Sequence, residues 1–174
     1  MKPRGFTLIE LLVVIAIIGL LASIVLASLT SARTKAKDAS RVATLTNIQL
    51  ALEEYYSDHN AYPSNTGWTS QCSGWGGVAA NSVIPGLVPS YMSSMPADPD
   101  MVTSSNVDCL IYYSNGTDYK LLDYNLVGST LSPYKSLIDP NRNIGTAWQN
   151  PSSCPSAAEG TWALAVWSAG GTCW

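Results

Sequence analysis

The residues able to do chemistry begin with four cysteines, Cys72, Cys109, Cys154 and Cys173. None forms a C-x-x-C pair, and His59 is far from all of them along the chain, so their spacing does not indicate a zinc site. An even number of widely spaced cysteines in a chain with an export signal indicates disulfides made in an oxidising compartment. Three pairings are possible. We favour Cys72–Cys109 with Cys154–Cys173, and four reduced thiols remain the alternative.

The other candidate catalytic groups are not arranged as a catalytic site. His59 is the only histidine and is expected at the solvated end of a helix. Glu53 and Glu54 are adjacent, so their side chains do not share a helix face. The chain has no nucleophile elbow and no phosphate-binding glycine loop. The sequence therefore predicts a protein that is not an enzyme and needs no cofactor.

Carboxylates in the second half of the chain raise the question of calcium. Asp98-Pro99-Asp100, Asp118 and Asp123 could supply oxygen ligands. Asp-Pro is also a common way to open a turn, which explains the first pair without a metal. Calcium stays an open alternative, and no metal site is assigned.

Charge is divided unevenly along the chain. Residues 1–42 hold six of the nine Lys and Arg residues against two carboxylates, while residues 43–174 hold three basic and ten acidic residues, a formal charge of −7. An acidic segment repels phosphate backbones, and it has no basic stripe with interleaved aromatic residues. Nucleic-acid binding is therefore not expected.

The first thirty residues contain a membrane-length apolar stretch with one carboxylate in it. Residues 11–29 carry no charge and as a helix would rise about 28 Å, close to the hydrocarbon thickness of a bilayer. Glu10 lies at its start, where a carboxylate in lipid costs on the order of 3 kcal/mol or less. A secretory signal peptide with a cleavage site near Ala27 is the alternative. The carboxylate, and the Ala-rich helical pattern that continues past Ala27, argue against it.

The segment from Arg4 to Ala22, RGFTLIELLVVIAIIGLLA, resembles the type IV pilin and pseudopilin superfamily. The resemblance implies cleavage between Gly5 and Phe6 by a prepilin peptidase, with N-methylation of Phe6. It also implies that Glu10 pairs with the Phe6 amine of a neighbouring subunit during assembly. An ammonium partner would remove most of the cost of a carboxylate in lipid. Many relatives have a proline where this chain has Ala27, so melting of the helix during assembly is in doubt here.

By the same resemblance, the partners are identical or related pilin subunits, the prepilin peptidase, an inner-membrane assembly platform and membrane lipid. The precursor would be a single-pass inner-membrane protein with its head outside the cytoplasm, and the product a periplasmic or cell-surface filament. Residues 51–63, ALEEYYSDHNAYP, are similar to the helix end of the major pseudopilin of type II secretion. That favours a pseudopilus; a true pilus for adhesion, motility or DNA uptake remains the alternative.

A long helix must position these groups. Apolar residues recur at spacings of three and four from Ala39 to Tyr55, whereas Asp38, Arg41 and Glu53 are expected off this stripe. The pattern predicts one helix from Phe6 to Ser57, with Asn60 as a C-cap. We expect a leader over 1–5, a transmembrane and polymerisation helix over 6–29, an amphipathic helix over 30–62 and a globular head over 63–174.

The head is expected to be a small antiparallel sheet. Apolar runs at 110–113 and 119–124 flank Asn115-Gly116, a strong hairpin signal. Asn115-Gly116-Thr117 also matches a glycosylation acceptor, although turn chemistry already explains it. A last strand is expected over 161–167. Residues 63–108 read as a long connection tied by Cys72, with a short helix near Leu87–Met92.

The expected fold is α+β and type IV pilin-like: a long N-terminal helix, apolar in its first half, packed against a small antiparallel sheet with long loops. The expected function is a structural, polymer-forming subunit. The rival is a membrane-anchored binding module that never polymerises and captures a ligand through tryptophans. Those are Trp68, Trp75, Trp148, Trp162, Trp167 and Trp174, most of which are more simply core and strand residues.

Overall fold

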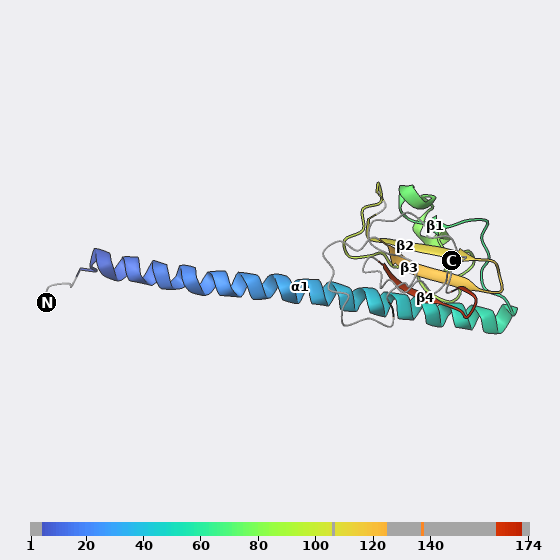
Figure 1. The fold of residues 1–174 in the computed structure, drawn as a ribbon, viewed down its shortest axis with the longest axis horizontal. Helices are drawn as coiled ribbons and strands as arrows, with labels where there is room; N and C mark the ends of the chain where they lie inside the picture. The colour runs from blue at the N-terminus through green and yellow to red at the C-terminus, as the bar shows by residue number, and fades with distance from the viewer. Residues whose placement is uncertain (1–4, 106, 125–136, 138–162, 172–174) are drawn as a thin grey trace.

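The fold is built on one helix, α1 (Leu8–His59), of 52 residues. A computed structural model describes residues 5–105, 107–124, 137 and 163–171. At helical rise α1 is about 78 Å long. Its first half projects alone, and its second half lies along one side of a globular head (Figure 1).

Both ends of α1 are defined by side-chain and backbone caps. Thr7 is the N-cap and forms a capping box with Glu10. At the other end Asn60 adopts a left-handed conformation, φ 52°, and its N–H donates to the Tyr56 carbonyl at 2.8 Å. The predicted helix from Phe6 to Ser57 and the predicted C-cap are therefore confirmed, with the bounds shifted by two residues.

The buried face of α1 differs from the predicted stripe. Its buried residues are Asp38, Arg41, Leu45, Ile48, Ala51 and Leu52. The placement of Asp38 and Arg41 off the buried stripe was wrong, and so was the inclusion of Ala39, which is exposed. Charged residues were assigned to solvent because burial of an unpaired charge is costly. Here Arg41 pairs with Asp38 on α1 itself and with carboxylates that are distant in the sequence, so the charges are paired inside the head.

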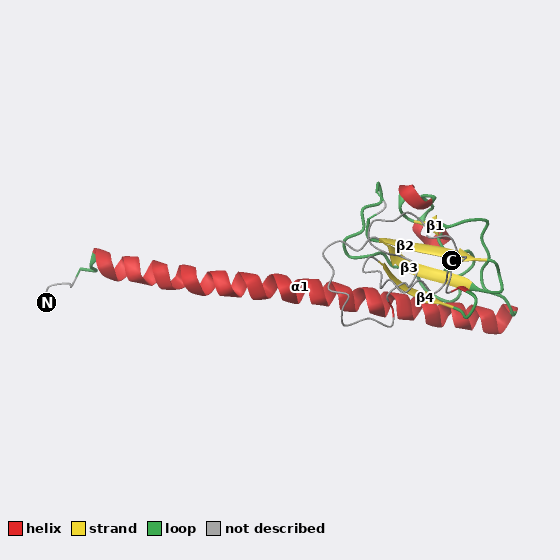
Figure 2. Ribbon diagram, in the orientation of Figure 1, coloured by secondary structure: helices red, strands yellow, loops and turns green. Residues whose placement is uncertain are grey.

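The head contains a four-stranded antiparallel sheet in the order β1-β2-β3-β4 (Figure 2). The strands are β1 (Thr69–Ser70), β2 (Cys109–Ser114), β3 (Tyr119–Tyr124) and β4 (Ala163–Trp167). The predicted hairpin and last strand are confirmed, although residues 161 and 162 lie outside the described part. Strand β1 was not predicted, because two residues carry no alternation pattern.

The sheet is buried on both faces. On one face the α1 residues Leu45, Ile48 and Leu52 pack with alternate residues of β2, β3 and β4. The inward-facing strand residues are Leu110, Tyr112, Tyr119, Leu121, Leu164 and Val166. The opposite face carries a smaller cluster around Cys72, Cys109, Ile111, Leu122 and Ala165. The α1 stripe thus forms one layer and the sheet the other.

The connection from α1 to β2 has only short helical pieces, η1 (Ser73–Trp75) and η2 (Ala80–Ser82). The short helix expected near Leu87–Met92 was wrong: that stretch consists of turns, in which the N–H groups of Tyr91 and Met92 both donate to the Leu87 carbonyl, at 2.9 and 3.3 Å. Val88 precedes Pro89, and the residue before a proline is disfavoured in the helical region.

The β2–β3 turn uses four residues, Asn115 to Asp118, rather than two. The Asn115 side-chain oxygen accepts from the N–H groups of Thr117 at 2.9 Å and Asp118 at 2.8 Å. Gly116 has φ 93°, which suits glycine. The turn position was predicted correctly, and the asparagine of the glycosylation acceptor is engaged in the turn itself.

A first test concerns Gly171, where the chain after β4 meets the start of β3. A Cβ placed on Gly171 would overlap the backbone carbonyl oxygen of Tyr119. Backbone cannot swing aside as a flexible side chain can, so Gly171→Ala is expected to lower the free energy of unfolding by about 1–3 kcal/mol. Urea unfolding of the full chain in detergent measures this. Gly67→Ala is the control, since its Cβ meets nothing within 4 Å; equal stability of the two variants would contradict the prediction.

Candidate functional site

The first half of α1 is apolar and uncovered. Every large apolar side chain from Phe6 to Leu29 is at least 42% exposed. The segment is long and apolar enough to cross a membrane, and the most apolar part of it buries nothing inside the molecule. An apolar surface of this extent requires lipid or other protein around it.

Glu10 is the only acidic residue in this segment, and the structure engages it with the residue at the helix start. Its carboxylate accepts from the Thr7 N–H at 2.8 Å and from the Thr7 hydroxyl at 2.7 Å. The Glu10 N–H in turn donates to the Thr7 hydroxyl oxygen at 3.3 Å. In the single chain the carboxylate is thus held by the N-terminal turn of α1.

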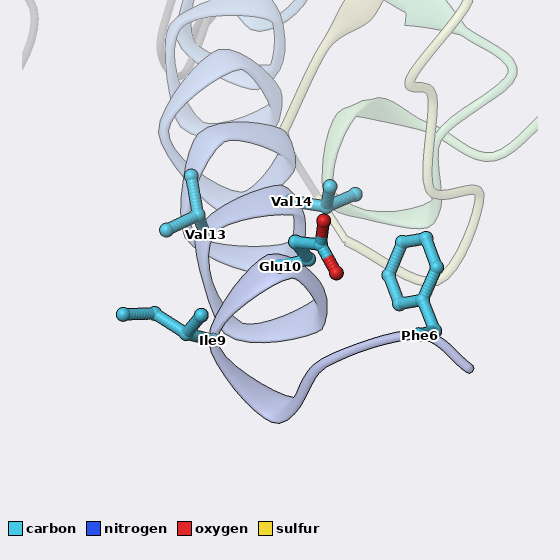
Figure 3. A pocket seen from close by; sticks show the side chains of 5 residues that line it. All are labelled: Phe6, Ile9, Glu10, Val13 and Val14. Carbon is cyan, nitrogen blue, oxygen red and sulfur yellow. The ribbon is translucent and has the colours of Figure 1, made fainter. Parts of the chain in front are cut away.

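Phe6 lies beside this carboxylate. Figure 3 shows Glu10 and Val14 on the side of the helix that faces Phe6, with Ile9 and Val13 on the other side. These five side chains line one apolar hollow. Gly5 and Phe6 are exposed and precede the helix, so the peptide bond between them is accessible. The two residues implied as the cleavage site and the carboxylate implied in assembly are therefore neighbours.

The predicted disulfide between Cys72 and Cys109 is confirmed, with the two Cα atoms 6.1 Å apart. It joins the long connection to the first residue of β2. Both cysteines are fully buried in the smaller apolar cluster. Cys154 and Cys173 lie outside the described residues, so their pairing stays a prediction.

A buried ionic cluster, which the sequence did not predict, joins α1 to the head. It is centred on Arg41, which is 2% exposed. Its guanidinium donates to Asp38 at 2.9 Å, Asp98 at 2.5 and 3.1 Å, Asp100 at 3.1 Å and Asp108 at 3.5 Å, and lies 3.9 Å from Asp123. We call Arg41 and these five aspartates the Arg41 cluster. It connects α1, the loop before β2 and β3.

The pKa of Arg41 reflects two opposing effects. Burial alone would lower the pKa of the guanidinium, but hydrogen bonds and charge attraction from Asp98, with help from Asp123 and Asp38, raise it above its usual value. Arg41 therefore stays charged. A buried guanidinium of this kind is stable only while its carboxylate partners remain in place.

The four carboxylates considered for calcium do not form one cation site. Asp98, Asp100 and Asp123 surround Arg41, so a guanidinium occupies the place where a cation would bind. Asp118 lies elsewhere, where it accepts from the Ser168 hydroxyl at 2.7 Å and the Gly170 N–H at 2.8 Å. Within the described part of the chain, no group of three His, Cys, Asp or Glu residues is arranged to hold a metal.

The remaining candidate residues have structural roles where the structure describes them. His59 is exposed, stacks on Tyr55 with ring centroids 4.0 Å apart, and has its Nδ1 3.0 Å from the Tyr55 carbonyl oxygen. Trp68 and Trp75 pack beside the disulfide and contact Tyr113 and Tyr124 respectively. Trp167 borders the same cluster, while Trp148, Trp162 and Trp174 lie outside the described residues.

Comparison with known proteins points to the same N-terminal segment. Residues 1–26 match the family model of the prokaryotic N-terminal methylation motif. No solved structure matches the chain.

Several curated proteins are similar over longer stretches. The chain is 33% identical to the type II secretion system core protein G of Pectobacterium carotovorum over 130 residues, which are 70% of this chain and 68% of that protein. It is 36% identical to the Escherichia coli core protein G over 56% of this chain and 67% of that protein. It is also 36% identical to a Neisseria meningitidis fimbrial protein over 60% of this chain and 58% of that protein.

The motif, the likeness to both groups and the fold agree. Members of this family are structural subunits rather than enzymes, in line with the absence of a catalytic arrangement in the sequence. With its methylation motif, its uncovered apolar helix and its antiparallel head, the chain belongs to the superfamily of type IV pilins and type II secretion pseudopilins, which form filaments.

Proposed function

We propose that this chain is a major-pseudopilin-type subunit, cleaved after Gly5, N-methylated at Phe6 and assembled into a filament through the first half of α1. The observation that carries the proposal is a single carboxylate, Glu10, at the start of the apolar first half of α1, whose large apolar side chains are exposed in the described part of the chain. Side-by-side packing of such helices would cover them.

Cleavage would place a new positive charge next to Glu10. The new amine would be that of Phe6, one residue before Thr7, whose N–H and hydroxyl now bind the carboxylate. In the bilayer a carboxylate without a cationic partner is costly. Pairing Glu10 with the Phe6 amine of a neighbouring subunit would remove most of that cost and set the axial register between subunits.

A pseudopilus is favoured over a true pilus because the chain is similar to proteins named as core protein G of the type II secretion system. The helix end at residues 51–63 also resembles that protein. Pilins are similar to the chain as well, so a pilus remains the second candidate.

The expected partners follow from this assignment. They are further copies of this chain or related subunits, a prepilin peptidase, an inner-membrane assembly platform and the lipid of that membrane. The precursor would cross the inner membrane once through residues 6–29, with residues 63–174 outside the cytoplasm. The mature filament would be periplasmic or on the cell surface.

The test is N-terminal sequencing and intact mass of the full chain, expressed with and without a prepilin peptidase. We expect a peptidase-dependent start at Phe6 carrying an N-methyl group. Gly5→Leu should leave the precursor uncleaved, because a bulky side chain would occupy the residue before the scissile bond.

Gly19→Ala is the matched control. It changes a glycine inside the apolar segment where a Cβ meets nothing within 4 Å, so cleavage should proceed normally. A start near Ser28, or an intact Met1 beside active peptidase, would refute the proposed processing and favour the membrane-anchored binding module.

A further inference from the structure

Two carboxylates of the Arg41 cluster share one guanidinium nitrogen. Asp98 and Asp123 are 6% and 1% exposed. The Arg41 Nε lies 2.5 Å from an Asp98 oxygen and 3.9 Å from an Asp123 oxygen. The second oxygen of Asp123 is buried and accepts no hydrogen bond from the described residues. Asp123 is therefore the carboxylate of the cluster whose charge Arg41 compensates least.

Charged groups face Asp123 from two of the elements around it. Helix α1 contributes Arg41 and Asp38, with Lys37 at the margin on Asp100; the loop before β2 contributes Asp98, Asp100 and Asp108. On β4 the residue paired with Asp123 is Leu164, which is uncharged. Among the described residues, five carboxylates thus meet two cations.

Full ionisation of this arrangement would be costly. Two buried carboxylates beside one guanidinium repel each other, and their burial weakens screening by solvent. Asp98 already accepts two bonds from Arg41 and one from the Asp100 N–H at 2.6 Å, so its charge is well stabilised. A proton on Asp123 would remove the repulsion and let its carboxyl group donate to Asp98.

We propose that the Arg41 cluster holds one proton between Asp98 and Asp123, so that the attachment of the head to α1 is firmest in acid and weakens as the pH rises. The Arg41 cluster joins the head to the helix through which, under the proposed function, the subunits polymerise. The pH outside the cytoplasm would therefore set how rigidly each head is held on that helix.

The direction of the pKa shift of Asp123 agrees with a stability that falls as the pH rises. Burial, and then the charge and hydrogen bond of Asp98, raise the pKa of the Asp123 carboxyl well above its usual value, against the lowering effect of Arg41. A group whose pKa is higher in the folded state stabilises that state fully below its unfolded pKa. That stabilisation is lost as the pH rises through the folded pKa. The affected window therefore runs upward from the ordinary pKa of an aspartate.

The cluster lies where loosening would be felt first. Asp38 and Arg41 are the first buried residues along α1, so the Arg41 cluster is at the edge of the head nearest the uncovered segment. The apolar contacts of Leu45, Ile48 and Leu52 follow further along the helix. Deprotonation would weaken the attachment of Asp98 and Asp100 to α1, while the apolar core and the Cys72–Cys109 disulfide hold the rest.

Urea unfolding of the full chain in detergent, followed by tryptophan fluorescence from about pH 4.5 to about pH 8.5, tests the proposal. We expect the folding equilibrium constant of the wild type to fall by up to about tenfold per pH unit within this window, the limit for one proton. Asp123→Asn keeps the shape and removes the charge, so its stability should be nearly flat. Glu54→Gln, an exposed carboxylate outside the cluster, should follow the wild type.

Infrared spectroscopy gives a second readout if Asp123→Asn does not fold. The wild type should show a protonated carboxyl band near neutral pH, where exposed carboxylates are ionised, and the band should disappear together with the stability. A wild type without that band, or stability that rises with pH through the window, would overturn the proposal. So would stability that depends on a chelator rather than on pH.

Discussion

Replacing Glu10 with glutamine is expected to reduce filament formation by about tenfold or more, while membrane insertion and the fold of the head stay unchanged. Glutamine keeps an oxygen that can accept from Thr7, so the N-terminal turn of α1 is preserved. Only the negative charge is lost, and losing one partner of a buried charge pair costs about 2–5 kcal/mol. Filaments sheared from cells that contain the peptidase, counted by electron microscopy, measure the effect.

Glu10→Asp separates charge from shape. It retains the carboxylate on a side chain one methylene shorter, so it should assemble better than Glu10→Gln. If the glutamine variant formed filaments at the wild-type level, the proposed pairing between Glu10 and the Phe6 amine would be wrong. Packing of the apolar helices would then account for assembly alone.

Replacing Arg41 with methionine is expected to lower the free energy of unfolding by about 3–5 kcal/mol, the range found when one partner of a buried ion pair is removed. Methionine fills much of the same volume, so the loss comes chiefly from carboxylates left buried without their cation. Four of them, Asp38, Asp98, Asp108 and Asp123, are themselves buried. Denaturant unfolding of the full chain in detergent at neutral pH measures the change.

Lys37→Met is the matched control. Lys37 also pairs with Asp100, but its side chain is 45% exposed, so water screens the pair. The loss should stay below about 1 kcal/mol. Equal effects of the two substitutions would show that the Arg41 cluster contributes no more than a surface pair. The loss in Arg41→Met should also shrink in acid, as the stranded carboxylates take up protons.

Apart from the Cys72–Cys109 disulfide, which was chosen among three possible pairings and joins residues 37 apart, the features that were predicted from the sequence depend on residues close together in the chain. The predicted C-cap uses Asn60 with Tyr56, whereas the capping box of Thr7 with Glu10 at the other end was not predicted. The hairpin depends on one turn between two apolar runs. Helix period, caps and turn residues act over a few positions, so a single sequence reveals them.

The Arg41 cluster could not be found in the same way, because its members are distant in sequence. Asp98 lies 57 residues from Arg41. A charged residue on a helix is assigned to solvent unless its partners are known. The one available signal of burial in the sequence was helical spacing. Asp38 and Arg41 continue, toward the N-terminus, the spacing of three and four residues set by Leu45 and Ile48. The spacing predicted burial, whereas residue type predicted exposure.

Strand β1 and the turns at residues 85–91 illustrate the same limit. β1 has two residues, and its place is set by pairing with Ile111 and Tyr112 on β2. The segment around Val88–Pro89 lies on the head core, where Leu87 is buried, so its turns are fixed by packing. In both cases tertiary contacts decide between local alternatives that the sequence leaves nearly equal.

The unbroken course of α1 has a geometric consequence for the fibre. Each helical residue advances the chain by about 1.5 Å and turns it by about 100°. Because α1 is continuous between Glu10 and Arg41, the number of residues between them sets the angle about the helix axis at which each head lies. This holds when the uncovered segments of neighbouring subunits are packed in register. One inserted residue would swing the head by about a quarter turn, whereas seven would return it to within about 20° of its original bearing. The length of the uncovered segment of α1 thus determines which face of each head lies on the outer surface of the filament.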